Sequence, residues 1–212
     1  MYEAFRNALV TYFVTVDPLG LAPIFLALTA PLAPGLRRRL AARAVLVGSA
    51  LLFLFALFGD GILEVLGISL AGFRIGGGVF LFVLALEMVF ERRGERRGSR
   101  ADRLAREQSA SELAVFPLGV PLIAGPAAIT AAILTKSRVA GDPADFLAAL
   151  VALALVLLLT WLVFRLAERL ERWLRPTLIA VLSRLFGLLL GALAAQYVID
   201  GILEVLPGVR AG

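Results

Sequence analysis

Long apolar stretches alternate with short charged segments along almost the whole chain. A helix needs about 20 mostly apolar residues to cross the hydrocarbon core of a bilayer. Six stretches meet this requirement, and each predicts one transmembrane helix: residues 5–30, 40–66, 70–90, 113–134, 146–166 and 178–206. The pattern therefore predicts an all-α membrane protein with six transmembrane helices in a single transmembrane domain, residues 1–212.

Composition supports this prediction and excludes several classes of function. Hydrophobic residues make up 60% of the 212 positions, which is more apolar surface than one soluble core can bury. The chain has no cysteine and no histidine, so disulfides, thiolate metal sites and histidine bases are absent. We therefore expect neither an enzyme nor a bound metal or cofactor. The net charge of +5 is carried by segments between the apolar stretches, which favours contact with membrane lipids over nucleic acid.

Basic residues gather on one side of the predicted membrane. They follow the first, third and fifth spans: Arg37, Arg38, Arg39, Arg43, Arg92, Arg93, Arg96, Arg97, Arg100, Arg103, Arg106, Arg165, Arg169, Arg172 and Arg175. The other side has only Arg6, Lys136, Arg138 and Arg210 near its span ends. Positive charge marks the cytoplasmic side, so we expect a charged cytoplasmic linker at 91–112, extracytoplasmic termini and an even number of spans.

The two halves of the chain carry similar landmarks in the same order. Spans one and four share a proline motif: Pro18-Leu19-x-x-Ala22-Pro23 and Pro121-Leu122-x-x-Gly125-Pro126. Spans three and six each have an arginine before an apolar run, Arg74 and Arg184. This order predicts two three-helix repeats, 1–90 and 113–206. Because three spans is an odd number, the repeats would be inverted relative to each other. The alternative is chance, since proline is common in membrane helices.

The proline motifs predict that helices one and four are broken mid-membrane. Proline removes a backbone donor and clashes with the preceding turn. Non-helical backbone at that depth lies beside protein or a water-filled cavity. Half-helix N-termini suit a carboxylate, and carbonyl ends suit an ammonium group, so a small zwitterion fits between them. The alternative is a pair of packing kinks. The candidate substrate-binding residues are Asp17, Pro18, Leu19, Gly20, Leu21, Pro23, Pro121, Ala124, Gly125, Pro126 and Ala127.

Asp17 has two compatible interpretations. An ionisable residue at mid-span is costly unless it is paired or hydrated, which is typical of a substrate-ammonium or proton site. Aspartate before proline is also a typical start of a helix, with the carboxylate as N-cap. The capping role is the favoured interpretation for Asp17.

Charged residues near the ends of spans three and six predict gating ion pairs. Arg74 lies at the level of Asp60, Glu64, Asp200 and Glu204 on one side, and Arg184 lies at the level of Glu87 on the other. The alternative is that these arginines extend to the membrane interface, which is favoured for Arg184. Gly76, Gly77 and Gly78 predict close packing of span three against another helix.

Taken together, these residues resemble the MarC family, which includes small neutral amino acid transporters of the SnatA type and is distantly similar to the LysE exporters. The resemblance covers nearly the whole chain and is carried by these segments: Asp17-Pro18-Leu19-Gly20, Pro23-Ile24-Phe25-Leu26, Leu66-Gly67-Ile68-Ser69, Phe73-Arg74-Ile75-Gly76-Gly77-Gly78, Phe116-Pro117-Leu118, Ala124-Gly125-Pro126, Ser183-Arg184-Leu185 and Gln196 to Gly201.

The resemblance implies a multi-pass protein of the bacterial or archaeal inner membrane that transports glycine, alanine or similar zwitterionic amino acids. It suggests coupling to Na⁺ or H⁺ and is compatible with a homo-oligomer. Leu21 and Ala127 depart from residues frequent in the family, Asn and Gly, so the exact substrate stays open. A channel or exporter for another small solute and a non-catalytic membrane assembly subunit are the alternatives.

Overall fold

The computed structural model describes residues 1–212 except 31, 91–113, 171–175 and 207–212. Within these residues the chain is helical and contains no β-strand. The elements, in order, are α1 (Tyr2–Val16), α2 (Pro18–Thr29), α3 (Pro34–Val65), α4 (Leu70–Val89), η1 (Ala114–Ile123), α6 (Pro126–Val139), α7 (Pro143–Leu170) and α8 (Pro176–Val205). The charged linker predicted at 91–112 lies outside the described residues.

The lengths of these helices confirm the predicted class of fold. Five stretches of the described chain are long and apolar enough to cross a membrane: Tyr2–Thr29, Pro34–Val65, Leu70–Val89, Pro143–Ala167 and Ala180–Val205. The pair Pro117–Ile123 and Pro126–Val139 adds a sixth span if it is counted as one, with a bend of 52° between its two parts. The chain is therefore an all-helical membrane protein with five to six spans.

Proline marks the start of most of these helices. Five of them begin with one: Pro18, Pro34, Pro126, Pro143 and Pro176. The first residue of a helix has no intrahelical acceptor for its N–H, and the fixed φ of proline is already helical. These prolines therefore determine where helices begin.

Two expectations about where the first two spans are interrupted or begin are wrong. Pro23 does not interrupt span one, because it lies inside α2, which continues to Thr29. Pro23 is exposed, and its missing N–H cannot donate a hydrogen bond to the preceding turn. The second span begins at Pro34 and not near residue 40, because proline favours a helix start and arginine is a good helix former.

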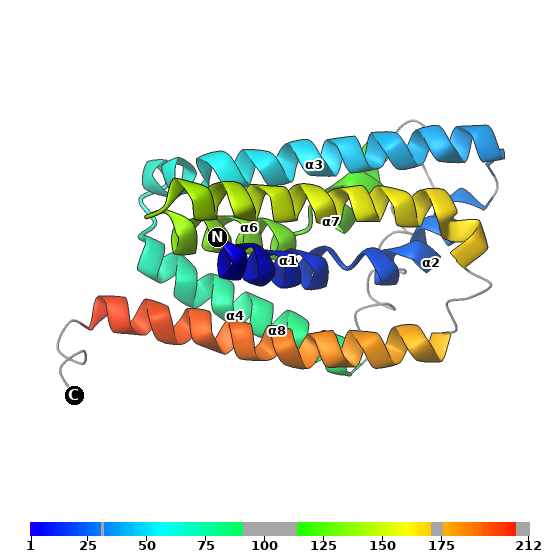
Figure 1. Ribbon diagram of the computed structural model, residues 1–212. Coiled ribbons are helices and arrows are strands. Elements are labelled where there is room, and N and C mark those ends of the chain that lie inside the picture. The colour runs from blue at the N-terminus through cyan, green and yellow to red at the C-terminus, as the bar shows by residue number, and fades with distance from the viewer. Residues whose placement is uncertain (31, 91–113, 171–175, 207–212) are drawn as a thin grey trace.

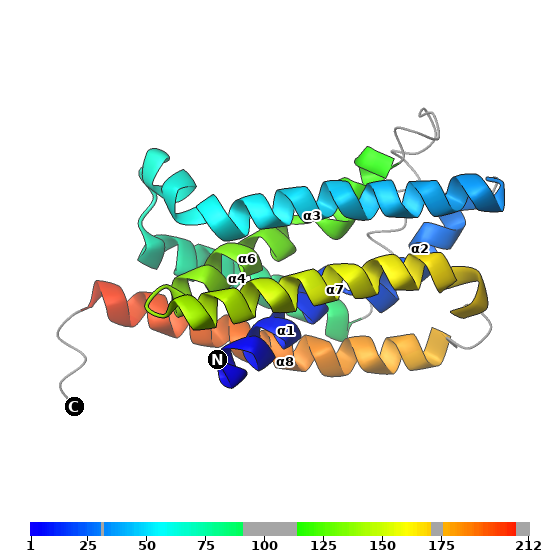
Figure 2. The same cartoon turned by 45° about the horizontal axis from the view of Figure 1, so that its top comes forward.

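The helices form one bundle in which α1 and α2 lie between α7 and α8 (Figure 1). The most extensive contact joins α4 to α8. Span one, α1 with α2, packs mainly on α7, whereas η1 and α6 pack mainly on α3 (Figure 2). If spans one to three correspond to spans four to six, then the contact of span one with α7, the fifth span, corresponds to the contact of span four with α3, the second span. The observed contacts agree with this correspondence. The inverted repeat itself stays a prediction.

Small residues form the antiparallel contact between α4 and α8. A Cβ on Gly78 would lie 2.9 Å from the Ala194 carbonyl oxygen, and a Cβ on Gly201 would lie 2.9 Å from that of Ala71. At the other end of the contact, a Cβ on Gly187 would lie 3.0 Å from the Ala85 carbonyl oxygen. The small residues recur every seven positions on both helices, which keeps them on one seam. Close backbone approach through small residues is the usual means of packing membrane helices.

The three consecutive glycines of α4 differ in their surroundings. Gly77 faces α6, where a Cβ would lie 2.6 Å from Thr130 Cγ2, and Gly78 faces α8. Gly76 is exposed and has nothing within 4 Å of the position of a Cβ.

This difference predicts opposite effects of two neighbouring substitutions. Gly78→Ala pushes α8 away from α4, and we expect a loss of stability of about 1–3 kcal/mol from overpacking. Gly76→Ala is the matched control, and we expect it to be neutral or stabilising because alanine is the better helix former. Thermal melting of the purified protein in detergent measures both. Equal melting temperatures for the two variants would contradict the packing described here.

Candidate functional site

The first span is interrupted at a single residue, Asp17. Its φ of 60° and ψ of 64° place it in the left-handed region, so α1 ends at Val16 and α2 starts at Pro18. The Gly20 N–H donates to Asp17 Oδ1 at 3.1 Å. Asp17 is therefore the N-cap that the sequence predicts. A Cβ on Gly20 would overlap the Asp17 carboxylate, so glycine is required for this close approach.

The fourth span is interrupted over a longer segment. Residues Ala114–Ile123 form wide π-helical turns, and the Ala124 N–H donates to the Gly119 carbonyl at 3.0 Å. A Cβ on Gly125 would lie 2.6 Å from the Pro121 carbonyl oxygen, so only glycine fits there. The chain then bends and starts α6 at Pro126. The second interruption is thus a π-helical turn followed by a new helix start.

Within the described residues, no side chain caps the N-terminus of α6. Its first N–H groups, those of Ala127 and Ala128, have no acceptor inside the helix. Both residues are buried, at 6% and 1% exposure. This helix end therefore carries partial positive charge in an apolar setting, which favours an anionic group.

The two interruptions belong to one buried region. Leu21 and Ala22 share a core cluster with Ile123, Ala124 and Ala128. On the adjacent side, Val14 shares a second cluster with Ala127. The two segments that the proline motifs singled out therefore lie in contact with the same core.

The candidate substrate-binding residues differ in exposure. Five are buried, four are half-buried and two are exposed: Pro18, Leu21, Ala124, Gly125 and Ala127; Asp17, Leu19, Gly20 and Pro121; Pro23 and Pro126. None of them lines either of the two pockets described next. Their role in binding stays a prediction.

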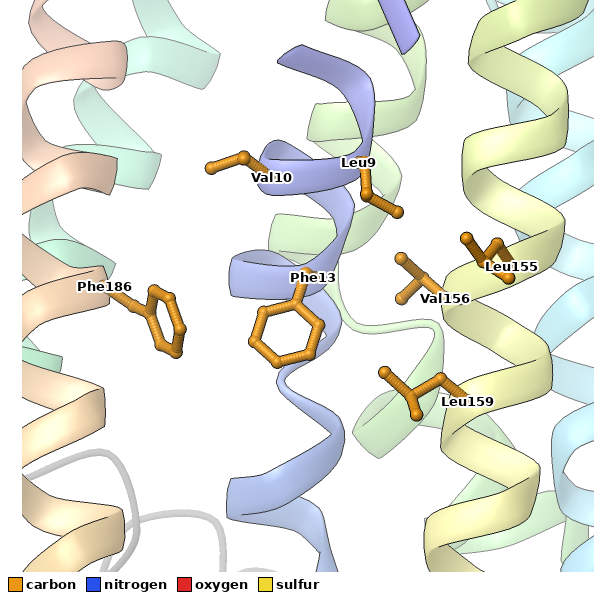
Figure 3. Close-up of a pocket in the computed structure, with 7 residues that line it drawn as sticks. All are labelled: Leu9, Val10, Phe13, Leu155, Val156, Leu159 and Phe186. Carbon is orange, nitrogen blue, oxygen red and sulfur yellow. The ribbon is translucent and has the colours of Figure 1, made fainter. Parts of the chain in front are cut away.

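An apolar pocket lies beside the first interruption. It has a volume of about 260 Å³ and is lined by Leu9, Val10, Phe13, Leu155, Val156, Leu159 and Phe186 (Figure 3). Phe13 and Phe186 meet edge to face, with ring centroids 5.2 Å apart. A second pocket, of about 510 Å³, lies along α3 next to Lys136. The first pocket offers no polar side chain to a zwitterion, so it is not a site for an amino acid.

Among the residues that the structure describes, three ion pairs between side chains join different helices at one end of the bundle, which we call the ion-pair end. Lys136 Nζ lies 2.9 Å from Asp60 Oδ2, and Arg138 Nη2 lies 3.1 Å from Asp200 Oδ2. Arg74 pairs with Glu204. The Arg74 Nη2 group also lies 3.4 Å from Ser137 Oγ. The consecutive residues 136–138 of α6 thus contact α3, α4 and α8.

The ion pairs differ in part from those expected. Arg74 pairs with Glu204, one of the carboxylates expected at its level, whereas Asp200 pairs with Arg138. Lys136 and Arg138, which form the other two pairs, are not among the predicted gating residues. A signal was available, since they are the basic residues at the same predicted level as Asp60 and Asp200.

Glu87 and Arg184 lie toward the opposite end of the bundle. The antiparallel register of α4 and α8, in which Ala85 meets Gly187, places them at the same level on neighbouring helices. This opposite end also carries the arginines at the start of α3 and at the end of α7, and we call it the arginine-rich end.

The fold defines a multi-pass helical membrane protein with five to six spans, one of which is a bent pair of helices. The chain belongs to the MarC family, since the model of the MarC family integral membrane proteins matches residues 2–206.

Its relatives occur in bacteria and archaea. The UPF0056 membrane protein YhcE of Escherichia coli K12 is 34% identical over 93% of this chain and 91% of its own length. A UPF0056 membrane protein of Methanocaldococcus jannaschii is 34% identical over 94% of this chain and 96% of its own length. No solved structure matches this chain significantly.

Two substitutions separate the capping role of Asp17 from any other. Asparagine tolerates the left-handed region and caps helices as well as aspartate, so we expect Asp17→Asn to leave the melting temperature nearly unchanged. Alanine does neither, and we expect Asp17→Ala to lower the stability by about 1 kcal/mol or more. Melting curves of both variants measure this difference. Similar destabilisation by both would show that the carboxylate charge stabilises the fold.

Proposed function

We propose that this protein is a secondary transporter of small neutral amino acids, such as glycine or alanine, in the inner membrane of its cell. The substrate binds at mid-membrane between the interruptions of spans one and four. The protein alternates between two conformations that open this site to one side at a time. It uses no resident cofactor and catalyses no covalent step, and a gradient of Na⁺ or H⁺ is the candidate energy source.

The observation that carries this proposal is the uncapped start of α6, where Ala127 and Ala128 are buried and Ala128 shares a core cluster with Leu21 of α2. The N–H groups of Ala127 and Ala128 suit the carboxylate of an amino acid. The C-terminal end of α1 carries partial negative charge from the helix dipole, which suits its ammonium group. The two features together favour a zwitterion over a simple anion or cation.

The small side chains at this place favour a small substrate. Ala124, Gly125 and Ala127 are buried, and none extends beyond a methyl group. Leu21 is also buried, at 1% exposure, and offers only apolar contact. A neutral substrate with a short side chain fits such surroundings, since a charged side chain would find no partner among these residues.

The packing of the helices supports the alternating mechanism. Span one packs on α7 and span four on α3, as expected if two inverted repeats exchange roles. The arginine-rich end would be cytoplasmic by the distribution of positive charge, and the ion-pair end extracytoplasmic. Both termini would then be extracytoplasmic.

Uptake into proteoliposomes tests the proposal directly. We expect saturable uptake of labelled glycine and alanine that responds to an imposed Na⁺ or H⁺ gradient. Empty liposomes and liposomes with a heat-unfolded sample are the controls. Absence of saturable uptake of any neutral amino acid, from protein that is monodisperse and folded, would rule out the proposal and favour another solute or an assembly role.

A proline substitution tests the role of the second interruption. Pro121→Ala restores a backbone donor and favours a straighter helix in span four. We expect alanine uptake to fall about tenfold or more while the protein still folds, because misplacing a binding group by about 1 Å is costly. Pro143→Ala, at the start of α7, is the matched control. An unchanged rate for Pro121→Ala would remove this interruption from the site.

A further inference from the structure

Three hydroxyl side chains meet in the buried interior between α1, α6 and α8. Tyr12, Thr135 and Tyr197 are exposed by only 2%, 5% and 1%. Both tyrosine hydroxyls lie near Thr135. Nevertheless, Thr135 Oγ1 completes no well-aligned hydrogen bond within the described part of the chain. A buried hydroxyl without a partner is costly, so this place favours a water molecule or a polar group of a solute.

The hydroxyl cluster, which is Tyr12, Thr135 and Tyr197, lies directly beneath an ion pair. Arg138 is three residues beyond Thr135 on α6, and Asp200 is three residues beyond Tyr197 on α8. This spacing places each charge one helical turn nearer the ion-pair end. The Arg138 guanidinium carbon lies 4.0 Å from the centre of the Tyr197 ring, so the arginine covers that tyrosine.

Asp200 is held in place from two sides. Its Oδ2 accepts from Arg138 Nη2 at 3.1 Å, and its Oδ1 accepts from Gln196 Nε2 at 2.7 Å. The Asp200 and Arg138 side chains are only about a third exposed, at 35% and 32%. The pair therefore lies between the hydroxyl cluster and the surroundings of the ion-pair end.

On its other side the cluster faces the two interruptions. Tyr12 precedes Asp17 by five residues, and Thr135 follows Pro126 by nine. At 1.5 Å per residue these separations are about 8 and 14 Å along the helix axes. The hydroxyl cluster thus lies between the interruptions and the ion-pair end.

We infer that Tyr12, Thr135 and Tyr197 line the part of the solute pathway between the two interruptions and the ion-pair end, and that the Arg138–Asp200 pair closes this pathway in the conformation described here. The inference rests on the proposed function for the existence of a pathway. Hydroxyl groups both donate and accept hydrogen bonds, so they suit the carboxylate and the ammonium of a zwitterion in passage. Separation of Arg138 from Asp200 would uncover Tyr197 and open the pathway.

The chain has no native cysteine, so a single introduced thiol reports on water access without background. The test variant is Thr135→Cys. The matched control is Thr160→Cys on α7, because Thr160 is also buried, at 0% exposure, and its hydroxyl already donates to the Val156 carbonyl at 2.8 Å. The probe is a charged, membrane-impermeant methanethiosulfonate, applied to the full-length protein in right-side-out and inside-out membrane vesicles.

We expect the thiol of Thr135→Cys to react, and that of Thr160→Cys to stay unreactive. In the Thr135→Cys background, Asp200→Asn should raise the labelling rate about fivefold, because it weakens the closing pair. A thiol at 135 that is as unreactive as the one at 160, in both backgrounds, would overturn the inference and leave only an enclosed structural water. Labelling that Asp200→Asn leaves unchanged would overturn the assignment of the gate.

A second pair of variants keeps the test decisive if Thr135→Cys does not fold. Thr135→Val removes the hydroxyl at nearly constant shape, and Thr135→Ser retains it. We expect uptake of labelled alanine to fall several-fold in the valine variant and to be preserved in the serine variant. Equal uptake by both would contradict a role for the hydroxyl.

The two readouts separate this inference from the proposed function. Labelling of position 135 does not depend on which solute is carried. If the thiol of Thr135→Cys reacts but the protein takes up no amino acid, the pathway is supported and the proposed substrate class is rejected. If amino acid uptake is saturable but the thiol at position 135 does not react, the proposed transport function is supported and the pathway past Thr135 is rejected.

Discussion

Every backbone N–H and C=O in the hydrocarbon core of a membrane must find a partner inside the protein, and this requirement explains most of the structure. The chain interrupts two of its spans, so it has to satisfy the groups that the interruptions release. The Asp17 side chain accepts from Gly20 N, and the Asp17 carbonyl accepts from Leu21 N at 3.1 Å. In span four, the π-helical turns and the hydrogen bond from the Ala124 N–H to the Gly119 carbonyl perform the same task. The unbroken helix α7 packs on α1 and α2, and the unbroken helix α3 packs on η1 and α6.

Three groups of polar residues are arranged in layers along the bundle axis. The interruptions lie in the interior, the hydroxyls of Tyr12, Thr135 and Tyr197 follow, and three ion pairs form the last layer. The small-residue seam between α4 and α8 fixes one side of this arrangement and holds Arg74 near Glu204. Polar groups in a membrane protein are expensive, and their concentration along one line favours a pathway over scattered packing roles.

Much of this architecture could be predicted from the sequence because the bilayer imposes a length on apolar segments. The Asp17-Pro18 step could also be predicted, since capping depends only on neighbouring residues. Pro23 was misinterpreted, because whether a helix tolerates proline depends on its surroundings. The partners of Arg74 and Asp200 depend on how each helix is rotated about its axis, which short sequence patterns do not determine. For the same reason Tyr12, Thr135 and Tyr197, from three distant segments, gave no signal before the fold was known.

Hydrogen–deuterium exchange of the protein in lipid nanodiscs, with and without alanine, tests the central claim most directly. If the interruptions form a substrate site reached by water, the amides of Leu19, Ala127 and Ala128 exchange faster than those in the middle of α7. Saturating alanine then slows them, because the bound carboxylate and ammonium occupy these helix ends. Exchange as slow as in α7, or exchange that alanine leaves unchanged, would contradict the claim that the two interruptions bind the substrate.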